Sequence, residues 1–260
     1  MLPGQPLWPD AGLEDLLELA SRKYSLEFEP ISVGSVQLEV LQVSDMRERL
    51  DKAIADNALE DALNTLPLWA KIWPASIILG HTLRHLPPGG SRNILEVGAG
   101  CGLAGLVAAA LGLGNVCISD INDDALLFAR INILKNNLQH CAEVRRVDVT
   151  ADSLGQKYSL ILGAEILYLD YLYRPLVKFF KRHMQSGKNE EPAWQPQVLL
   201  ASDHRRKAAA FLKKAAKEFR IETKQIGVAA RGTDGDTGKP ERHLISLHRL
   251  TIPGDISILK

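Results

Sequence analysis

The sequence predicts an α/β protein with one mostly parallel sheet of seven strands, an antiparallel hairpin at the edge of that sheet, and helices on both faces. Two observations predict this fold. From residue 66 onward, apolar runs of strand length alternate with segments of helical periodicity, which is the pattern of a parallel sheet. The last two strand-like runs follow each other without a helix between them, and this predicts the hairpin.

Composition limits the classes of protein to which the chain can belong. It has 260 residues, of which 46% are hydrophobic, enough to bury a full core. The formal net charge is +0, so no overall field attracts nucleic acid or an anionic membrane. The three cysteines lack CxxC spacing, and we expect them to be buried thiols in a reducing compartment and not metal ligands.

Targeting and membrane signals are not recognisable in the sequence. The start of the chain is rich in proline and lacks a basic stretch followed by an apolar run, so it does not resemble a secretory signal. The longest apolar run, residues 102–113, is too short to span a bilayer. We therefore expect a soluble, cytoplasmic protein with no membrane partner and no bound metal.

Residues 1–65 are expected to form an accessory segment in front of a domain of residues 66–260. The order predicted for this segment is a helix capped by Asp10 and ending near Arg22, a hairpin of strands 26–31 and 35–43, and a helical stretch over 45–63. The sequence does not indicate what this layer does.

The elements of the domain follow in order. A helix is predicted to begin just after Trp73, because Pro74 is favourable in a first helical turn. The strands are predicted at 94–97, 115–119, 144–147, 158–163, 197–201, 221–228 and 243–251. Helices are predicted from residue 103, over 123–137, over 169–184 with an interruption at Pro175, and over 205–220. Polar loops are predicted at 185–196 and 231–241.

Two tryptophans precede the first helix of the domain and have two interpretations. Core packing is the more common role for a tryptophan considered alone. Because Trp69 and Trp73 lie just before a helix that leads into the glycine-rich strand, they are also candidates for the mouth of a ligand site.

The apolar strand that begins at Ile94 runs into a glycine-rich turn and then into a helix, which is typical of a nucleotide-type ligand site. Two glycine patterns overlap there. Gly98-x-Gly100-x-Gly102, preceded by Glu96, favours a ligand with a positive amino group. Gly100-x-Gly102-x-x-Gly105 satisfies the dinucleotide fingerprint. The turn alone does not decide between them.

The first four strands of the domain each end in a carboxylate or carry one near the end: Glu96, Asp120, Asp148 and Glu165. Each alone could cap a helix, and for Asp148 a turn role is equally expected. Four together would repel a pyrophosphate but suit the ammonium, ribose diol and adenine amino group of S-adenosylmethionine. We expect Glu96 to orient the methionyl end, Asp120 to bind the ribose, and Asp148 and Val149 to flank the adenine.

The same argument favours the first glycine triplet. Gly98, Gly100 and Gly102 are then the cofactor turn, and Gly105 is a packing position where the helix lies close to the sheet.

Glu165 and Tyr168 lie where the fourth strand opens toward the expected methyl group. A lysine acceptor must first lose a proton, and with a pKa of about 10.4 only on the order of one in a thousand is neutral at pH 7. A hydrogen bond to Glu165 and a cation–π contact with Tyr168 would hold and align the amine. The alternative is that Glu165 caps a helix and Tyr168 only packs.

At this point four stretches of the chain resemble a known family: Trp73 with its helix, Leu95–Gly105, Ser119–Asp120 and Leu160–Tyr168. They are similar to the seven-β-strand protein lysine methyltransferases, which carry a D/E-x-x-Y/F motif after the fourth strand. Such enzymes modify single lysines on folded chaperones, elongation factors or an electron-transfer flavoprotein. The resemblance covers roughly residues 66–250.

The resemblance implies a Rossmann-like class I methyltransferase fold, S-adenosylmethionine as cofactor and a protein lysine as acceptor. It implies cofactor contacts at Trp73, Gly98, Ala99, Gly100, Asp120, Val149 and Ala164, and a substrate site at Glu165 and Tyr168. The family often has tryptophan where this chain has Val149, which weakens adenine stacking. Residues 1–65 and the 185–196 loop lie outside the resemblance, and substrate choice in such enzymes tends to reside in such regions.

Three other functions stay open at this stage: a small-molecule N-methyltransferase, an NAD-dependent oxidoreductase based on the second glycine pattern, and a cofactor-binding scaffold without catalysis. A basic cluster is also present, made of Arg205, Arg206, Lys207, Lys213, Lys214 and Lys217. On a helix with an apolar inner side such a cluster is more often a solvated surface than a nucleic-acid site.

Overall fold

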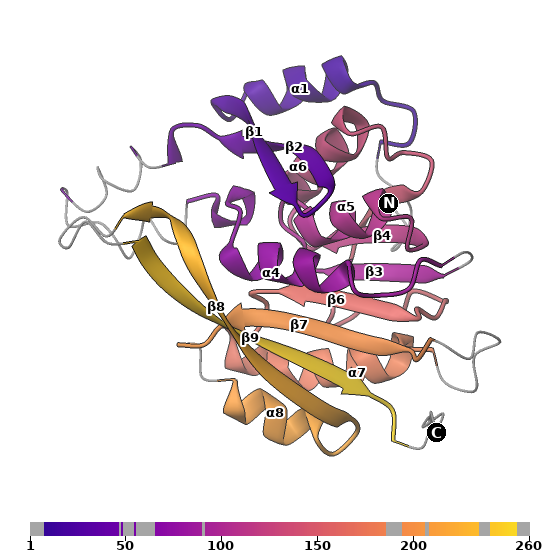
Figure 1. The fold of residues 1–260 in the computed structure, drawn as a ribbon. Coiled ribbons are helices and arrows are strands. Elements are labelled where there is room, and N and C mark those ends of the chain that lie inside the picture. The colour runs from indigo at the N-terminus through magenta and orange to yellow at the C-terminus, as the bar shows by residue number, and fades with distance from the viewer. Residues whose placement is uncertain are drawn as a thin grey trace.

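The centre of the protein is a seven-stranded sheet (Figure 1). The computed structural model describes residues 8–46, 48, 55, 66–89, 92–185, 194–205, 208–233 and 240–253. The strands of the sheet are β3 (Asn93–Val97), β4 (Asn115–Asp120), β5 (Ala142–Arg146), β6 (Leu160–Ala164), β7 (Gln197–Asp203), β8 (Arg220–Thr233) and β9 (Pro240–Thr251). Their order across the sheet is β5-β4-β3-β6-β7-β9-β8.

The pairing of these strands confirms the predicted sheet. β3 pairs in parallel with β4 and β6, β4 with β5, and β6 with β7. β9 is antiparallel to both of its neighbours, β7 and β8, and forms the edge hairpin with β8. The chain builds outward from β3 to β5 and then returns to add β6 on the other side of β3. In such sheets ligands bind beyond the carboxyl ends of the strands where the order reverses, which here means β3 and β6.

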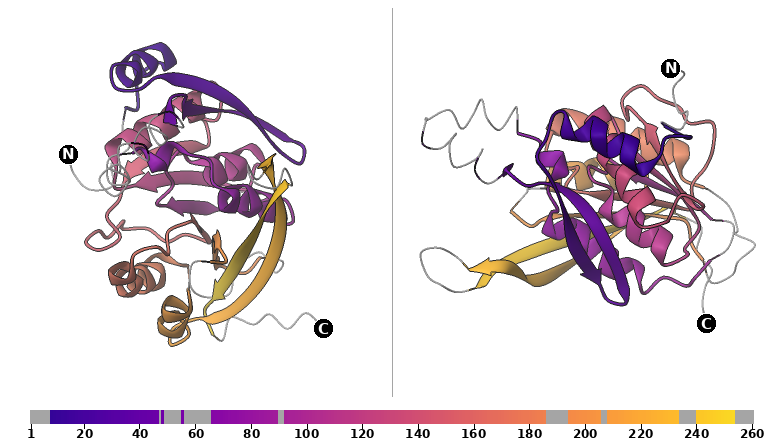
Figure 2. Two further views of the ribbon diagram at one scale, coloured as in Figure 1. Left: turned by 90° about the vertical axis from the view of Figure 1, so that its left-hand side faces the viewer. Right: turned by 90° about the horizontal axis from the view of Figure 1, so that it is seen from above.

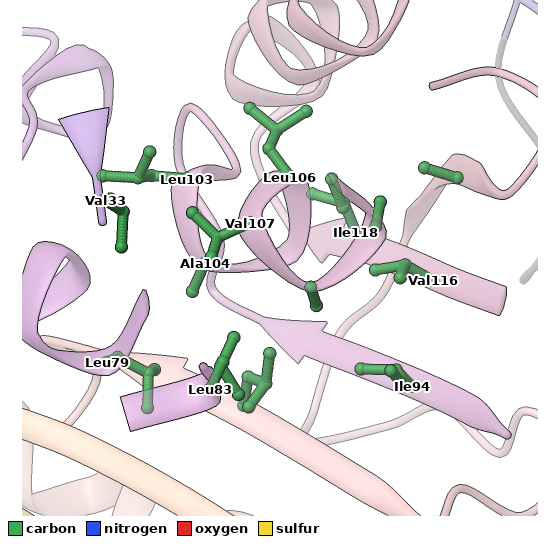
Figure 3. Close-up of a cluster of buried hydrophobic side chains, with 14 of the residues drawn as sticks. Val33, Leu79, Leu83, Ile94, Leu103, Ala104, Leu106, Val107, Val116 and Ile118 are labelled. Carbon is green, nitrogen blue, oxygen red and sulfur yellow. The ribbon is translucent and has the colours of Figure 1, made fainter. Parts of the chain in front are cut away.

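Helices cover both faces, as predicted. One face carries α4 (Pro74–Leu83), α5 (Leu103–Ala110) and α6 (Asp123–Lys135), and the other carries α7 (Tyr173–His183) and α8 (Ala209–Ala215). Neighbouring residues of β3 point to different faces, because side chains alternate along a strand: Ile94 packs in the first core and Leu95 in the second. Figure 3 shows part of the first core, where Leu83 of α4 and Val107 of α5 meet β3.

An outer layer covers α5 and α6. It consists of α1 (Leu13–Ser21) and a hairpin of β1 (Leu26–Val33) and β2 (Val36–Val43), which confirms the predicted hairpin. Figure 2 shows this indigo layer lying over the magenta helices. Leu16 packs with Phe128 of α6, and Val33 belongs to the same core as α4 and α5. The described part of residues 1–65 therefore shares its core with the rest of the chain.

Four helices differ from their predicted bounds, and the smallest difference is in α6, which ends at Lys135 and not at residue 137. The N-cap of α1 is Gly12 and not Asp10, and the Asp15 carboxylate accepts a hydrogen bond from the Gly12 N–H at 3.3 Å. α7 is not interrupted at Pro175, which lies in its first turn after the short 3-10 helix η2 (Asp170–Leu172). α8 is shorter than predicted at both ends, and before its start the Asp203 carboxylate accepts the Arg205 N–H at 2.9 Å, which stabilises a turn.

The edge hairpin is longer than predicted. β8 continues to Thr233 and β9 begins at Pro240, so part of the predicted loop over 231–241 is strand. Pairing with the opposite strand continues past a register shift after Ala229. Most of the predicted helical stretch at 45–63, most of the 185–196 loop, and Arg206 and Lys207 of the basic cluster lie outside the described residues.

Candidate functional site

The turn after β3 contains three glycines with a left-handed backbone, with φ of 59° at Gly98, 55° at Gly100 and 82° at Gly102. A side chain at Gly100 would place its Cβ 2.4 Å from the Trp69 carbonyl oxygen, so this position requires glycine on steric grounds as well. These are the three glycines that the sequence favoured for the cofactor turn. The turn leads directly into α5, for which Gly102 is the N-cap.

The Glu96 carboxyl points into the fold, beneath the start of α5. It is 1% exposed, and its Oε2 accepts a hydrogen bond from the Gly105 N–H at 2.8 Å. Burial raises the pKa of Glu96 to about 8. A Cβ at Gly105 would lie 2.6 Å from this oxygen and from Ile118, so Gly105 has the predicted packing role. In this arrangement Glu96 stabilises the α5 N-terminus, and its contact with a ligand stays a prediction.

Asp120 ends β4 and binds the glycine turn directly. Its Oδ2 accepts the Gly100 N–H at 2.9 Å, and its Oδ1 accepts the Asn122 N–H at 3.0 Å. Burial raises the pKa of Asp120, although these hydrogen bonds oppose the shift. The structure thus brings Asp120 and Gly100 together, as expected for residues of one site. The predicted bond to a ribose is not tested by these contacts.

Asp148 follows β5 and forms a turn with its own neighbours. Its Oδ1 accepts the Thr150 N–H at 2.8 Å and the Thr150 hydroxyl at 2.6 Å, and these bonds lower the pKa of Asp148. This is the turn role that the sequence left open. Val149 is half-buried beside it. That both residues flank an adenine stays a prediction.

The two tryptophans have different surroundings. The Trp69 ring packs edge-on against Phe128 and Tyr24, with centroids 4.9 Å and 5.6 Å away, so Trp69 has the core-packing role. Its carbonyl accepts the Cys101 N–H at 3.1 Å and so reaches the glycine turn. Trp73 is the N-cap of α4, is half-buried, and donates its ring N–H to the Leu68 carbonyl at 3.1 Å. Its predicted cofactor contact is untested.

Glu165 follows Ala164, the last residue of β6, and has a left-handed backbone with φ of 57°. Non-glycine residues rarely adopt this conformation, and such strain is concentrated at functional sites. The Glu165 Oε1 accepts the Asp203 N–H at 2.7 Å. A Cβ at Gly98 would lie only 2.8 Å from the Cγ2 atom of the next residue, Ile166. Glu165 therefore lies beside the glycine turn, at the end of an adjacent strand.

The large apolar side chains that the described residues expose all lie at the carboxyl edge of the sheet. They are Ile121 after β4, Tyr168 and Tyr171 after β6, and Leu244 of β9, whose carbonyl accepts the His204 N–H beyond β7. Tyr171 is the most exposed, at 71%, and Tyr168 is 57% exposed. Exposed aromatic side chains at this edge are candidates for contact with a partner molecule.

Sequence reasoning missed Asp203 as a member of this site. The Arg205 guanidinium binds its carboxylate at 2.7 Å, and these bonds lower the pKa of Asp203 to about 2. His243 Nδ1 lies 3.9 Å from the same carboxylate. The signal that could have found it was the position of Asp203 at the end of the fifth strand, which places it at the same edge as the other carboxylates.

Within the described ranges, no three His, Cys, Asp or Glu side chains form a group that could hold a metal ion. Nor does any helix in those ranges have the length and apolar character needed to cross a bilayer. The three cysteines are free, with Cys101 and Cys117 buried and Cys141 only half-buried.

A comparison with protein families gives a match over residues 41–218, more than half of the chain, to a model described as lysine methyltransferase. The chain belongs to this lysine methyltransferase family. The match begins within β2, at residue 41, and includes all candidate site residues from Trp73 to Asp203. The resemblance found in the sequence is therefore confirmed at the level of the family.

Two curated methyltransferases are similar to this chain in sequence. Protein N-lysine methyltransferase METTL21A of Xenopus tropicalis is 35% identical over 130 residues, covering 46% of this chain and 57% of that protein. Protein N-terminal and lysine N-methyltransferase EFM7 of Cryptococcus neoformans is 27% identical over 162 residues, covering 54% of each. The chain thus spans about half the length of the curated relatives it matches.

A solved structure supports the fold of the family member. A tRNA (uracil-54, C5)-methyltransferase of Pyrococcus abyssi, in complex with S-adenosyl-L-homocysteine, aligns with a TM-score of 0.51 and 18% identity. The alignment covers 86% of this chain and 44% of that one. At this identity the likeness concerns the fold alone, which is the Rossmann-like methyltransferase fold predicted from the sequence.

Proposed function

We propose that the chain is an S-adenosylmethionine-dependent methyltransferase that acts on a lysine side chain of a protein. Membership of the lysine methyltransferase family supports the reaction, and the names of the relatives support a protein acceptor. The observation that carries the proposal is the position of Glu165, a strained carboxylate-bearing residue directly beside the glycine turn. A carboxylate next to a nucleotide-type turn suits the transfer of a group to an amine.

The glycine turn fits S-adenosylmethionine better than it fits a pyrophosphate. The Gly100 N–H already donates to the Asp120 carboxylate, so a carboxylate occupies the place where a phosphate would need a donor. We assign the backbone of the turn to the methionyl part, Asp120 to the ribose, and Asp148 with Val149 to the adenine, with Trp73 and Ala164 at the rim. When bound, the cofactor supplies a methyl group that its sulfonium has already activated.

The remaining task of the chain is to hold a neutral amine in line with that methyl group. The hydrogen bond from the Asp203 N–H fixes the direction of the Glu165 carboxylate, which can then accept an N–H of the lysine. The exposed ring of Tyr168 offers a face to the amine before it loses its proton. The exposed Tyr171 extends the same surface toward a protein acceptor.

The proposal includes two further statements. Residues 66–260 form the methyltransferase domain, and residues 1–65 are an accessory segment, whose described part shares the core of the domain. The protein works in the cytoplasm, where its three free cysteines stay reduced. Cell fractionation with an antibody against the chain tests the location, and recovery in an oxidising compartment would contradict it.

Tritiated-methyl transfer into a lysate of the source organism tests the function. We expect a labelled protein band whose label, after hydrolysis, is found on methylated lysine. Label found only in small molecules would instead identify a small-molecule N-methyltransferase. Calorimetry with S-adenosylhomocysteine and with NADH distinguishes an oxidoreductase from a scaffold. Tight NADH binding without the thioether would identify an oxidoreductase, and thioether binding without any label would identify a scaffold.

A further inference from the structure

Asn132 of α6 and Asn136, the C-cap of that helix, bind the outer edge of β2. The Asn132 Oδ1 accepts the Leu41 N–H at 2.7 Å. Asn136 forms a two-way pair with Glu39: its Oδ1 accepts the Glu39 N–H at 2.9 Å, and its Nδ2 donates to the Glu39 carbonyl at 2.8 Å. The side-chain amides thus replace a neighbouring strand and satisfy backbone groups that β2 would otherwise leave open.

The two asparagines differ in their second contact. The Asn132 Nδ2 donates to the Cys101 carbonyl at 3.0 Å, inside the glycine turn, and the Asn132 side chain is 0% exposed. The Asn136 Nδ2 donates instead to the Glu39 carbonyl and to the backbone carbonyl of Asn132, away from the turn. One buried amide therefore joins β2 of the outer layer to the turn after β3.

The conformation of the turn at Cys101 depends on hydrogen bonds from outside the turn. This residue lies between two left-handed glycines, Gly100 and Gly102, and glycine crosses between backbone regions more readily than any other residue. Its N–H is held by the Trp69 carbonyl at 3.1 Å and its carbonyl by Asn132. Without the second bond, a buried carbonyl would lack a partner, and the peptide could turn to find another.

We propose that Asn132 is a positioning residue for the cofactor. By fixing the Cys101 carbonyl, it keeps the backbone of the glycine turn in the conformation that accepts S-adenosylmethionine, and through Leu41 it makes that conformation depend on the outer layer. This inference rests on the proposed function, because the ligand of the turn is assigned there. It gives the outer layer a role that the glycine motif alone does not indicate.

The test compares Asn132→Ala with Asn136→Ala, which removes a similar strand contact but none to the turn. Calorimetry with S-adenosylhomocysteine is run on both full-length variants at a temperature where circular dichroism shows them folded. We expect binding to weaken about 10-fold for Asn132→Ala, the effect of one lost hydrogen bond, and by less than about 2-fold for Asn136→Ala. Equal weakening in both variants, or no weakening in either, would overturn the proposal.

A second pair keeps the test decisive if Asn132→Ala does not fold. Asn132→Asp has nearly the same shape, and its protonated carboxyl can still donate to the Cys101 carbonyl. We expect its affinity for S-adenosylhomocysteine to fall as pH rises and this proton is lost, whereas Asn136→Asp follows the wild type. A flat profile for Asn132→Asp would refute the inference. Failure of the wild-type chain to bind at all would instead overturn the proposed function.

Discussion

The turn after β3 and the turn after β6 end adjacent strands and touch each other, yet their left-handed residues are of different kinds. The first has glycines at φ of 59°, 55° and 82°, which adopt this conformation without strain. The second has Glu165 at 57°, where a side chain costs about 1–2 kcal/mol. The residues of the first turn favour its left-handed backbone conformation, whereas the residue at the second turn disfavours it.

The difference shows which part of each residue matters. At the glycine turn the backbone matters, because the Gly100 N–H binds the Asp120 carboxylate and a side chain at Gly100 would meet the Trp69 carbonyl. At the second turn the side chain acts, and the backbone strain is the cost of aiming it. The two turns should therefore respond differently to substitution, and five experiments test this contrast.

The largest effect is expected for Gly100→Ala. The new Cβ would lie 2.4 Å from the Trp69 carbonyl at a positive φ, so we expect at least about 3 kcal/mol of lost stability and no measurable binding of S-adenosylhomocysteine. Thermal unfolding and calorimetry measure both. Gly112→Ala is the matched control, because Gly112 has a φ of 64° with nothing within 4 Å, and it should cost only about 1 kcal/mol. Equal effects at both positions would remove the steric argument.

The next largest effect is expected on turnover, when Glu165 in the second turn is substituted. Glu165→Gln keeps an acceptor for the Asp203 N–H but removes the charge, so kcat should fall about 100-fold. Affinity for S-adenosylhomocysteine should stay within about 2-fold of the wild type. Asp170→Asn, an exposed acid on the same connection, serves as control and should leave kcat unchanged. Unchanged turnover in Glu165→Gln would show that the carboxylate is only a turn residue.

The stability of the protein is expected to depend on pH through Glu96, which lies beneath the first turn. Burial raises the pKa of Glu96 to about 8, whereas in the unfolded chain this carboxyl ionises near its ordinary value of 4.5. Between these values the unfolded chain binds fewer protons, so stability falls as pH rises, by at most about 1.4 kcal/mol per pH unit. Glu96→Gln should flatten this part of the stability profile, measured by denaturant unfolding at pH 5, 6, 7 and 8. Parallel profiles would contradict the assigned burial.

Relief of the backbone strain at Glu165 should give a smaller effect, a gain in stability. Glu165→Gly and Glu165→Ala both lose the carboxylate, but only glycine also loses the strain. We expect the Gly variant to be about 0.5–1 kcal/mol more stable than the Ala variant, although glycine adds entropy to the unfolded chain. Urea unfolding measures the difference. If the Ala variant proved the more stable of the two, the left-handed backbone would not be strained.

The smallest effect is expected for Tyr171→Ala. Because this ring is 71% exposed, its loss should change stability by less than about 0.5 kcal/mol. It should raise KM for a folded protein acceptor a few-fold, about 1 kcal/mol of lost contact, and leave KM for a short lysine peptide unchanged. Steady-state kinetics with both acceptors measures this. A matching rise with the peptide would place Tyr171 at the lysine itself and not on a docking surface.

The sheet was predictable because its signals are local. Apolar runs of strand length, such as the one that begins at Ile94, mark the buried parallel strands, and the strand–helix alternation fixes their sense. The glycine turn was predictable for the same reason, since left-handed positions favour glycine. Sequence signals for helix starts were less reliable. Asp10 is a residue type that often caps helices, but Gly12 is the N-cap of α1.

The parts of the site that sequence reasoning missed depend on contacts between distant residues. Nothing near Asp203 indicates that its N–H meets Glu165, which is 38 residues away. The inward direction of Glu96 was readable in principle, because strand alternation places it on the same face as Ile94, toward α5. Asn132 looks like an ordinary polar residue of a helix until the fold brings β2 and the turn to it.

The bond between Leu41 and Asn132 also bears on how the protein is synthesised. The two residues are 91 positions apart, so the hairpin leaves the ribosome well before the asparagines that cover its edge. At about 5–20 residues per second, β2 waits roughly 5–20 s with open backbone groups. An open strand edge is a site of wrong pairing between nascent chains. The time between translation of β2 and translation of α6 is therefore a period in which this edge is open to wrong pairing.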